Sequence, residues 1–444
     1  MKRTLIHNAI IVNDGVKKQG SVLIEDGMIA QVLTDGKPLT LPYTKFIDAT
    51  GCYLLPGVID EHVHFRDPGL THKADIRTES MAAAAGGVTS VMDMPNTQPQ
   101  TTTLETLEQK MELMAQKSVV NYSCYFGATN SNYADLPKID RHRTCGVKLF
   151  MGSSTGNMLV DRQESLKRIF GGTDQVIVAH CEDQNIIRQN MAKYKEVVDV
   201  PVWKHRLIRS SEACYQSTKL AVKLATEAGA RLHVAHVSTA RELALFSKEP
   251  LFMKSITAEA CIAHLMFSDE DYKTLGALIK CNPSVKRRAD REALRAALTN
   301  NLIDTIATDH APHTLEEKQG GALKATSGMP MIQLSLLCML ELVDEGVLTI
   351  EKLVEKMCHA PAELFGIEQR GYIAEGAWAD LVLVRPGGAW EVTPEVILSK
   401  CGWSPLLGHK FHWRVEKTFC NGHLVFDGKT VDETKKGQAL WFNF

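Results

Sequence analysis

Histidine side chains that follow short apolar runs are the residues of this sequence best suited to chemistry. His62 and His64 follow the apolar run 54–59, and residues two apart on a strand point to the same side. Three further candidates each follow a similar run: His180, His236 and Asp309. Imidazole and carboxylate groups are typical ligands of zinc-like divalent ions. If the fold brings these runs together, the sequence predicts a metal centre.

Lys148, in the apolar run 145–150, completes the set of candidates. Two cations held close together need an anionic bridge, whereas an ammonium group would repel them. A lysine whose pKa is lowered by burial can instead add carbon dioxide, and the resulting carbamate is an anion that can bridge both ions. We therefore expect two divalent metal ions, Zn²⁺ first, and carbon dioxide bound as a carbamate on Lys148.

Asp309 is the candidate catalytic residue of this site. Water between two metal ions becomes hydroxide near neutral pH and attacks a carbonyl or amide carbon. A carboxylate beside that water can take its proton and later give it to a leaving nitrogen. Taken singly, the candidates also have structural explanations: the histidines as core residues, Lys148 as the partner of a buried acid, and Asp309 as a helix cap. Their joint placement at strand ends favours the site.

Short apolar strands alternate with helical stretches between residues 55 and 365. The expected strands are 58–62, 89–93, 123–127, 146–150, 176–180, 232–236, 255–258 and 304–308. The expected helices are 75–85, 104–116, 211–228 and 287–298, with a buried apolar helix over 331–342. Strands separated by crossovers in this way predict an α/β fold, the (β/α)8 TIM barrel, which places its chemistry at the C-terminal ends of its strands.

Both ends of the chain are rich in β-branched residues and turns. The runs 9–12, 21–24 and 379–384 are typical of strands, and 418–426 predicts a hairpin around Asn421-Gly422. We expect a small β-sandwich domain built from the N- and C-terminal segments, residues 1–54 plus 366–444. The catalytic barrel, residues 55–365, is inserted between them.

Composition restricts the classes of protein to consider. The chain has 444 residues, is 44% hydrophobic and 23% charged, and carries a net charge of −2, so nothing favours a nucleic-acid surface. It has 11 cysteines and no CxxC pair, which indicates reduced thiols. We see no signal peptide and no stretch long enough to span a membrane. A cytoplasmic protein is the expectation.

Several motifs carry a resemblance to a known family. They are DEHVHFRDPG at 60–69, AAAAGGVT at 82–89, DMPNT at 93–97, GVKLF at 146–150 and TDHAPH at 308–313. With these, the sequence resembles the amidohydrolase superfamily and, within it, the dihydroorotases, over nearly its whole length. The resemblance implies that one metal is held by His62, His64 and Asp309, the other by His180 and His236, and that Lys148 bridges them.

The resemblance also implies a reaction and its partners. The reaction is the reversible cyclisation of N-carbamoyl-L-aspartate to L-dihydroorotate in pyrimidine biosynthesis. Relatives form homo-oligomers, which makes a dimer the expectation, and an association with an aspartate transcarbamoylase stays open. Residues matching those that bind the substrate are Arg66, Asn96, Asn282, His313, Ser327 and Gly328. Arg66 can form a bidentate pair with the ring carboxylate.

Two alternatives remain open at this point. Hydantoinases, dihydropyrimidinases and allantoinases share the metal set but act on cyclic amides without the ring carboxylate, so Arg66 and Asn96 favour dihydroorotate. A non-catalytic structural homologue of the fold is a different class, and the complete ligand set argues against it. His264 departs from the family pattern in its surroundings, and we leave it out of the site.

Overall fold

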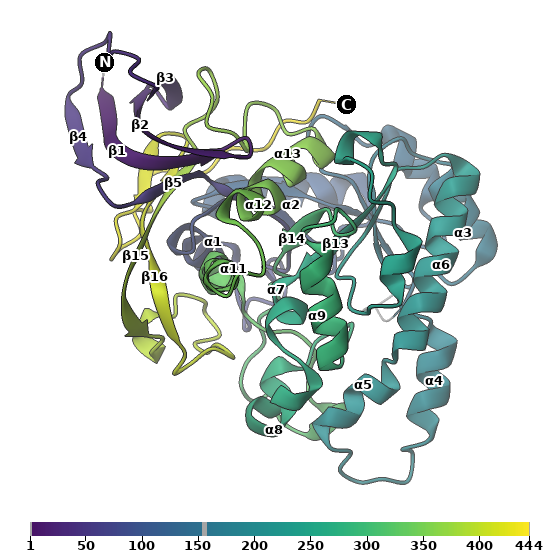
Figure 1. Ribbon diagram of the computed structural model, residues 1–444. Coiled ribbons are helices and arrows are strands. Elements are labelled where there is room, and N and C mark those ends of the chain that lie inside the picture. Colours follow the sequence, from purple (N-terminus) through teal and green to yellow (C-terminus); the bar gives the residue numbers. More distant parts are fainter. Residues whose placement is uncertain (1, 153–157, 444) are drawn as a thin grey trace.

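The computed structural model describes residues 2–152 and 158–443 of the chain, and its centre is a barrel of parallel strands (Figure 1). Its strands are β6 (Val58–Val63), β7 (Val88–Asp93), β8 (Asn121–Cys124), β9 (Phe126–Gly127), β10 (Val147–Phe150), β11 (Ile177–His180), β12 (Leu232–Val234), β13 (Ile256–Cys261) and β14 (Thr305–Ala307). Neighbours along this order pair in parallel from β6 to β8 and from β9 to β14. A parallel bridge between Val63 and His310 closes the ring. The predicted barrel is therefore confirmed.

Helices follow the strands and cover the outside of the barrel (Figure 1). They are α1 (Ile76–Ala85), α2 (Leu104–Lys117), α3 (Gln163–Phe170), α4 (Gln184–Ala192), α5 (His205–Ile208), α6 (Ser211–Ala228), α7 (Ile262–Met266), α8 (Tyr272–Leu275), α9 (Arg288–Ala297), α10 (Gly321–Lys324), α11 (Ser335–Asp344), α12 (Ile350–Val354) and α13 (Ala360–Phe365). A π-helical turn, η8 (Glu355–His359), joins the last two.

Local sequence signals set the helix ends. The Asp75 side chain accepts a hydrogen bond from the backbone N–H of Thr78 and caps α1, and Ser210 does the same for Ala213 in α6. Gly229 ends α6 in the left-handed region with φ 66°, where a residue without Cβ is favoured. The four helices predicted over 75–85, 104–116, 211–228 and 287–298 all form, with ends that agree closely.

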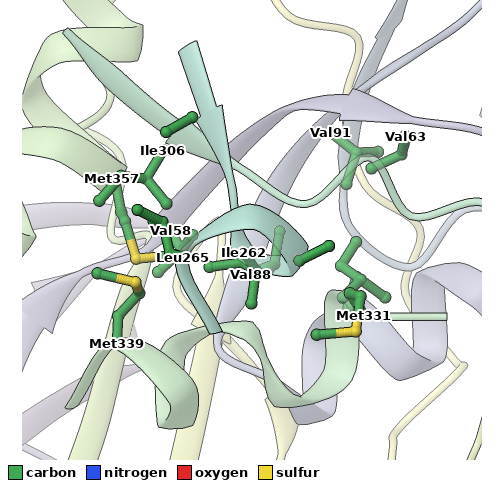
Figure 2. Packing of buried hydrophobic residues seen from close by; sticks show 14 of the residues in the cluster. Val58, Val63, Val88, Val91, Ile262, Leu265, Ile306, Met331, Met339 and Met357 are labelled. Carbon is green, nitrogen blue, oxygen red and sulfur yellow. The ribbon is translucent and has the colours of Figure 1, made fainter. Parts of the chain in front are cut away.

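The apolar segment 331–342 is buried and largely helical, as predicted. It forms a short turn, η7 (Ile332–Leu334), and most of α11. Figure 2 shows Met331 and Met339 among valine and isoleucine side chains of the strands, and both methionines are at most 1% exposed. Such close packing of the helix on the strands stabilises the barrel, because apolar surface is removed from water.

The two ends of the chain share one sheet. Its strands are β1 (Arg3–Asn13), β2 (Val16–Glu25), β3 (Met28–Thr34), β4 (Lys45–Asp48), β5 (Tyr53–Pro56), β15 (Leu381–Glu391), β16 (Lys410–Cys420) and β17 (His423–Phe426). The order is β17-β16-β15-β5-β1-β2-β3, with β4 beside β1. Strands from both ends contribute to a common core that includes Ile6, Val22, Leu381 and Phe419. The hairpin predicted at 418–426 forms, with Asn421 and Gly422 at φ 51° and 71°.

Segments near the C-terminus also return to the barrel. Leu440 donates its backbone N–H to Tyr122 O at 2.8 Å, and Tyr122 N–H reaches Gln438 O at 3.0 Å. The Trp403 indole N–H donates to His313 O at 2.7 Å. The boundaries 1–54 plus 366–444 and 55–365 stay a prediction, since such contacts join the two parts. No helix among the described residues has the length and apolar character of a membrane span.

Candidate metal and substrate site

A cavity of about 340 Å³ opens at the C-terminal ends of the barrel strands. Every metal, catalytic and substrate residue predicted from the sequence lines it. The predicted residues are His62, His64, Arg66, Asn96, Lys148, His180, His236, Asn282, Asp309, His313, Ser327 and Gly328. Four lining residues were not predicted: Lys73, Phe150, Ala311 and Thr326. The structure thus brings the predicted set to one place, whereas the role of each member stays a prediction.

His62, His64 and Asp309 form the first group of candidate ligands. Asp309 Oδ1 lies 3.4 Å from His62 Nε2 and 3.2 Å from His64 Nε2. One ligand atom from each of the three residues falls within 4.8 Å of the other two. Their second ring nitrogens point away from this group, to Glu259 Oε1 at 2.8 Å and to Asn96 Oδ1 at 2.7 Å. This group can bind a divalent metal ion.

His180, His236 and Lys148 form the second group. His180 Nδ1 and His236 Nε2 face each other at 2.9 Å. The Lys148 Nζ is fully buried and has no hydrogen-bond partner in the described structure, although such groups are nearly always paired. Burial lowers the pKa of Lys148. An unpaired buried nitrogen in the cavity that the four histidines line fits a site whose remaining partner is a bound group.

The charge states of the candidate ligands also suit metal binding. Burial lowers the pKa of His64 to about 4 and that of His236 well below its usual value. Burial alone would raise the pKa of Asp309, but His62 and His64 outweigh it and lower that pKa. At neutral pH His64 and His236 are therefore neutral imidazoles and Asp309 is an ionised carboxylate, the forms that bind cations.

Two buried glutamates orient the histidines and were missed by the sequence interpretation. Glu259 Oε1 accepts hydrogen bonds from His62 Nδ1 and from the backbone N–H of His236, both at 2.8 Å. Glu182 Oε2 lies 2.9 Å from His180 Nε2 and also accepts from Arg209. Despite burial, His62 and Arg209 respectively lower the pKa of each carboxyl to about 2. Carboxylates in this position fix the ring orientation and tautomer of metal-binding histidines.

Glu259 could have been found from the sequence, because it lies in a strand that is longer than predicted. The sequence predicted a strand over 255–258, whereas β13 runs from Ile256 to Cys261. Glu259 is therefore a carboxylate inside an apolar strand, fully buried, and such a group needs a partner. A strand prediction extended by three residues would have placed it beside the histidines.

Three site residues hold the backbone in the left-handed region. The φ angles are 68° for Arg66, 38° for His236 and 49° for Asp309. Non-glycine residues rarely adopt this conformation, and they persist in it where surrounding structure imposes it. Each of these residues follows the end of a strand, so the turn directs its side chain into the cavity rather than along the barrel wall.

One side of the cavity is a wall of loops that carries the predicted substrate residues. Arg66 Nε donates to Pro312 O at 3.0 Å, and its Nη2 lies 3.1 Å from His313 Nε2. Lys73 Nζ lies 3.2 Å from His313 Nδ1. Burial, together with these two cations, strongly lowers the pKa of His313, so its ring is neutral. Arg66 is 7% exposed, and burial lowers its pKa.

Two of the predicted substrate residues are also engaged with the protein. Asn96 Oδ1 faces His64 Nδ1, so Asn96 supports a candidate metal ligand as well as lining the cavity. Asn282 Oδ1 lies 3.0 Å from His205 Nε2. Gly328 has φ +136°, and a Cβ there would lie 2.5 Å from Ala311 O. Only glycine lets the chain pass this close to its neighbour.

Comparison with known proteins defines the class to which this fold and site belong. The model of the Amidohydrolase family matches residues 53–425, and the chain belongs to this family. It is 35% identical to a dihydroorotase of Halobacterium salinarum over 418 residues, covering 92% of this chain and 96% of that one. It is 30% identical to an allantoinase of Bacillus velezensis, covering 95% and 93% of the two chains.

Solved structures agree with this assignment. The L-hydantoinase (dihydropyrimidinase) from Arthrobacter aurescens superposes with a TM-score of 0.94 at 28% identity, covering 99% of this chain and 100% of that chain. A family resemblance to dihydroorotases and amidohydrolases was predicted from the sequence and is confirmed. The relatives act on different cyclic amides by name, so the comparisons support a cyclic amidohydrolase.

Proposed function

We propose that the protein is a dihydroorotase that interconverts N-carbamoyl-L-aspartate and L-dihydroorotate. The observation that carries this proposal is the buried Arg66. Among the described residues no carboxylate lies within ion-pair distance of its guanidinium, yet the side chain is only 7% exposed. A buried cation is costly without a partner, and a ring carboxylate in the cavity would supply one in bidentate geometry.

Asn96 and His313 extend this anion site. Both line the cavity with Arg66, and the His313 ring lies next to the guanidinium at 3.1 Å. A neutral His313 can donate one N–H to a carboxylate. Because its ring is uncharged, it does not repel the Arg66 guanidinium. Hydantoin and allantoin lack a carboxylate on the ring, so for them Arg66 would remain without an ionic partner.

The metal centre is part of the proposal. Two divalent cations, Zn²⁺ first, would be held by His62, His64, Asp309, His180 and His236; when bound, they supply a Lewis acid for the carbonyl oxygen and a water of lowered pKa. Lys148 would join them as a carbamate. Its neutral amine nitrogen bonds to the carbon of carbon dioxide, and the nitrogen loses one proton to solvent.

Asp309 is the proposed proton carrier. During ring opening its carboxylate accepts the proton of the attacking water and delivers it to the ring nitrogen as the C–N bond breaks. In ring closure the same group enters protonated, and each transfer runs in reverse. The lowered pKa of Asp309 means that its carboxylate is ionised at neutral pH and therefore free to accept a proton.

The test is a comparison of substrates on one enzyme preparation. Turnover of L-dihydroorotate should exceed turnover of hydantoin and of allantoin, and metal analysis should find the protein loaded. Cleavage of hydantoin without cleavage of dihydroorotate would overturn the choice of substrate. A folded, metal-free and inactive protein would instead support the non-catalytic homologue.

A second candidate function is a hydantoinase or allantoinase. The close structural match to an L-hydantoinase and the identity to an allantoinase favour it. We further propose a cytoplasmic homodimer, with association to an aspartate transcarbamoylase as a partner to test by co-purification. Gel filtration with light scattering decides the oligomeric state.

A further inference from the structure

Beyond Arg66 and Asn96, the substrate wall is formed by three separate chain segments. Residues 280–283 carry Asn282, residues 313–319 begin with His313, and residues 326–328 contribute Ser327 and Gly328. The direct backbone link between the first and the last of these is the Gly328 N–H to Lys280 O hydrogen bond of 2.8 Å. The second and third segments are joined by the Thr326 N–H to Glu317 O hydrogen bond of 2.8 Å. Among the described residues no ladder of a regular sheet holds all three segments together.

Lys318 occupies the place where the three segments meet. Its Nζ donates to the carbonyl oxygens of Gly328 at 2.7 Å, Thr326 at 3.0 Å and Lys280 at 3.1 Å. An ammonium has three N–H donors, and here each faces a backbone acceptor. Lys318 itself belongs to the turn after His313 and is 2% exposed. One buried lysine thereby joins all three segments of the wall.

Its neighbours strengthen this arrangement. Lys280 O accepts from both Lys318 Nζ and Gly328 N–H, and the Nζ of Lys280 donates to Ala325 O. The Trp403 ring centroid lies 5.8 Å from Lys318 Nζ, and its indole N–H donates to His313 O at 2.7 Å. Trp403 thus covers the ammonium and fixes the backbone of a predicted substrate residue.

The contacts of Lys318 go to backbone carbonyls of the wall, while the metal ligands are oriented by Glu259, Glu182 and Asn96. Among the described residues the two sets share no hydrogen bond. A change at Lys318 should therefore displace Asn282, His313 and Ser327 without releasing metal. Small displacements of substrate-positioning groups have large effects on rate and affinity.

We propose that Lys318 is a positioning residue that fixes the substrate wall, so that substrate affinity depends on it and metal binding does not. The inference rests on the proposed function only in taking this wall as the substrate side of the cavity. It applies to whichever cyclic amide the wild-type protein turns over, and that substrate is used in the test. A failure of the dihydroorotase proposal is therefore distinguishable from a failure of this one.

The test is steady-state kinetics of Lys318→Met, which keeps the length of the side chain and removes its donors. The KM should rise roughly tenfold or more, with metal content unchanged. A merely structural role would lower the fraction of active protein, and hence apparent kcat, but would leave KM unchanged. Lys318→Arg, which keeps the charge and the donors, should recover part of the KM.

Lys356→Met is the matched control. Lys356 is also 2% exposed, but it lies in η8, pairs with Glu355 at 3.1 Å and is near Asp304, before β14, at the other end of the barrel. Its loss should leave KM at the wild-type value. Should Lys318→Met fail to fold, Trp403→Phe removes the N–H to His313 O and part of the ring that covers Lys318, and it should raise KM several-fold. An unchanged KM in folded Lys318→Met, or in Trp403→Phe as its substitute, overturns the proposal.

Discussion

The floor and the wall of the cavity are held in different ways. The floor consists of strand ends, and buried carboxylates fix its histidines through side-chain hydrogen bonds, as Glu259 does for His62 at 2.8 Å. The wall consists of loops, and Lys318 holds these loops through backbone carbonyls at 2.7 to 3.1 Å. Because the floor lies on rigid strands, its metal-binding residues keep their arrangement. Changes in the loops can alter which substrate binds without disturbing the floor. The relatives named for different cyclic amides agree with this division.

The largest expected effect comes from Asp309→Asn, which changes the floor chemically while keeping its shape. The amide cannot accept the proton, so kcat should fall about 10²- to 10⁴-fold. The four histidines remain, so metal should still be found by elemental analysis of the purified variant. A kcat within a few-fold of wild type would show that Asp309 is not the proton carrier.

Arg66→Gln tests the wall. Loss of the charged hydrogen bonds to a ring carboxylate should raise the KM for dihydroorotate about 10- to 100-fold, with metal content unchanged. Arg66→Lys is the matched variant. It keeps the positive charge but loses the paired N–H donors of the guanidinium, so it should recover only part of the affinity. If KM for hydantoin rises equally, Arg66 does not recognise the carboxylate.

Glu259→Gln tests the support of the floor. The amide is a weaker acceptor for His62 Nδ1–H, so metal affinity should fall roughly tenfold. At saturating metal the KM for substrate should stay near the wild-type value, because the wall is intact. Competition with a chelator measures the affinity. A raised KM with unchanged metal affinity would contradict the separation of floor and wall.

The smallest effect concerns His409, in the segment that brings Trp403 to the wall. The hydrogen bond to Glu341 raises the pKa of His409. The folded protein therefore binds this proton more tightly than the unfolded chain does. The stabilisation is present below the usual pKa of about 6.5 and is lost as pH rises through the raised value. His409→Gln should lower Tm slightly at pH ~5.5. The difference in Tm between the variant and the wild type should disappear at pH ~8.5. An equal decrease in Tm at both pH values would contradict this assignment of the pH dependence to His409.

The same division explains what could be predicted from the sequence. Strands and their last polar residues follow from local patterns, so His62, His180, His236 and Asp309 were placed correctly at one rim. The Lys318 contacts depend on how three loops meet, and no local pattern reports that. Glu259 was missed for a simpler reason, because the strand that carries it was predicted too short. Lys73 lies in a loop after Arg66, where no periodicity marks a side chain that enters a cavity.

The terminal sheet has a consequence for the order of synthesis. β5 pairs with β15 through Leu55 and Val382, among others, so its partner leaves the ribosome only after the whole barrel has been made. Until then β5, which also borders β1, presents an unpaired edge to other chains. If the barrel folds before β15 has been made, it folds while joined to this open edge, and residues 53–56 are then exposed to pairing with other chains.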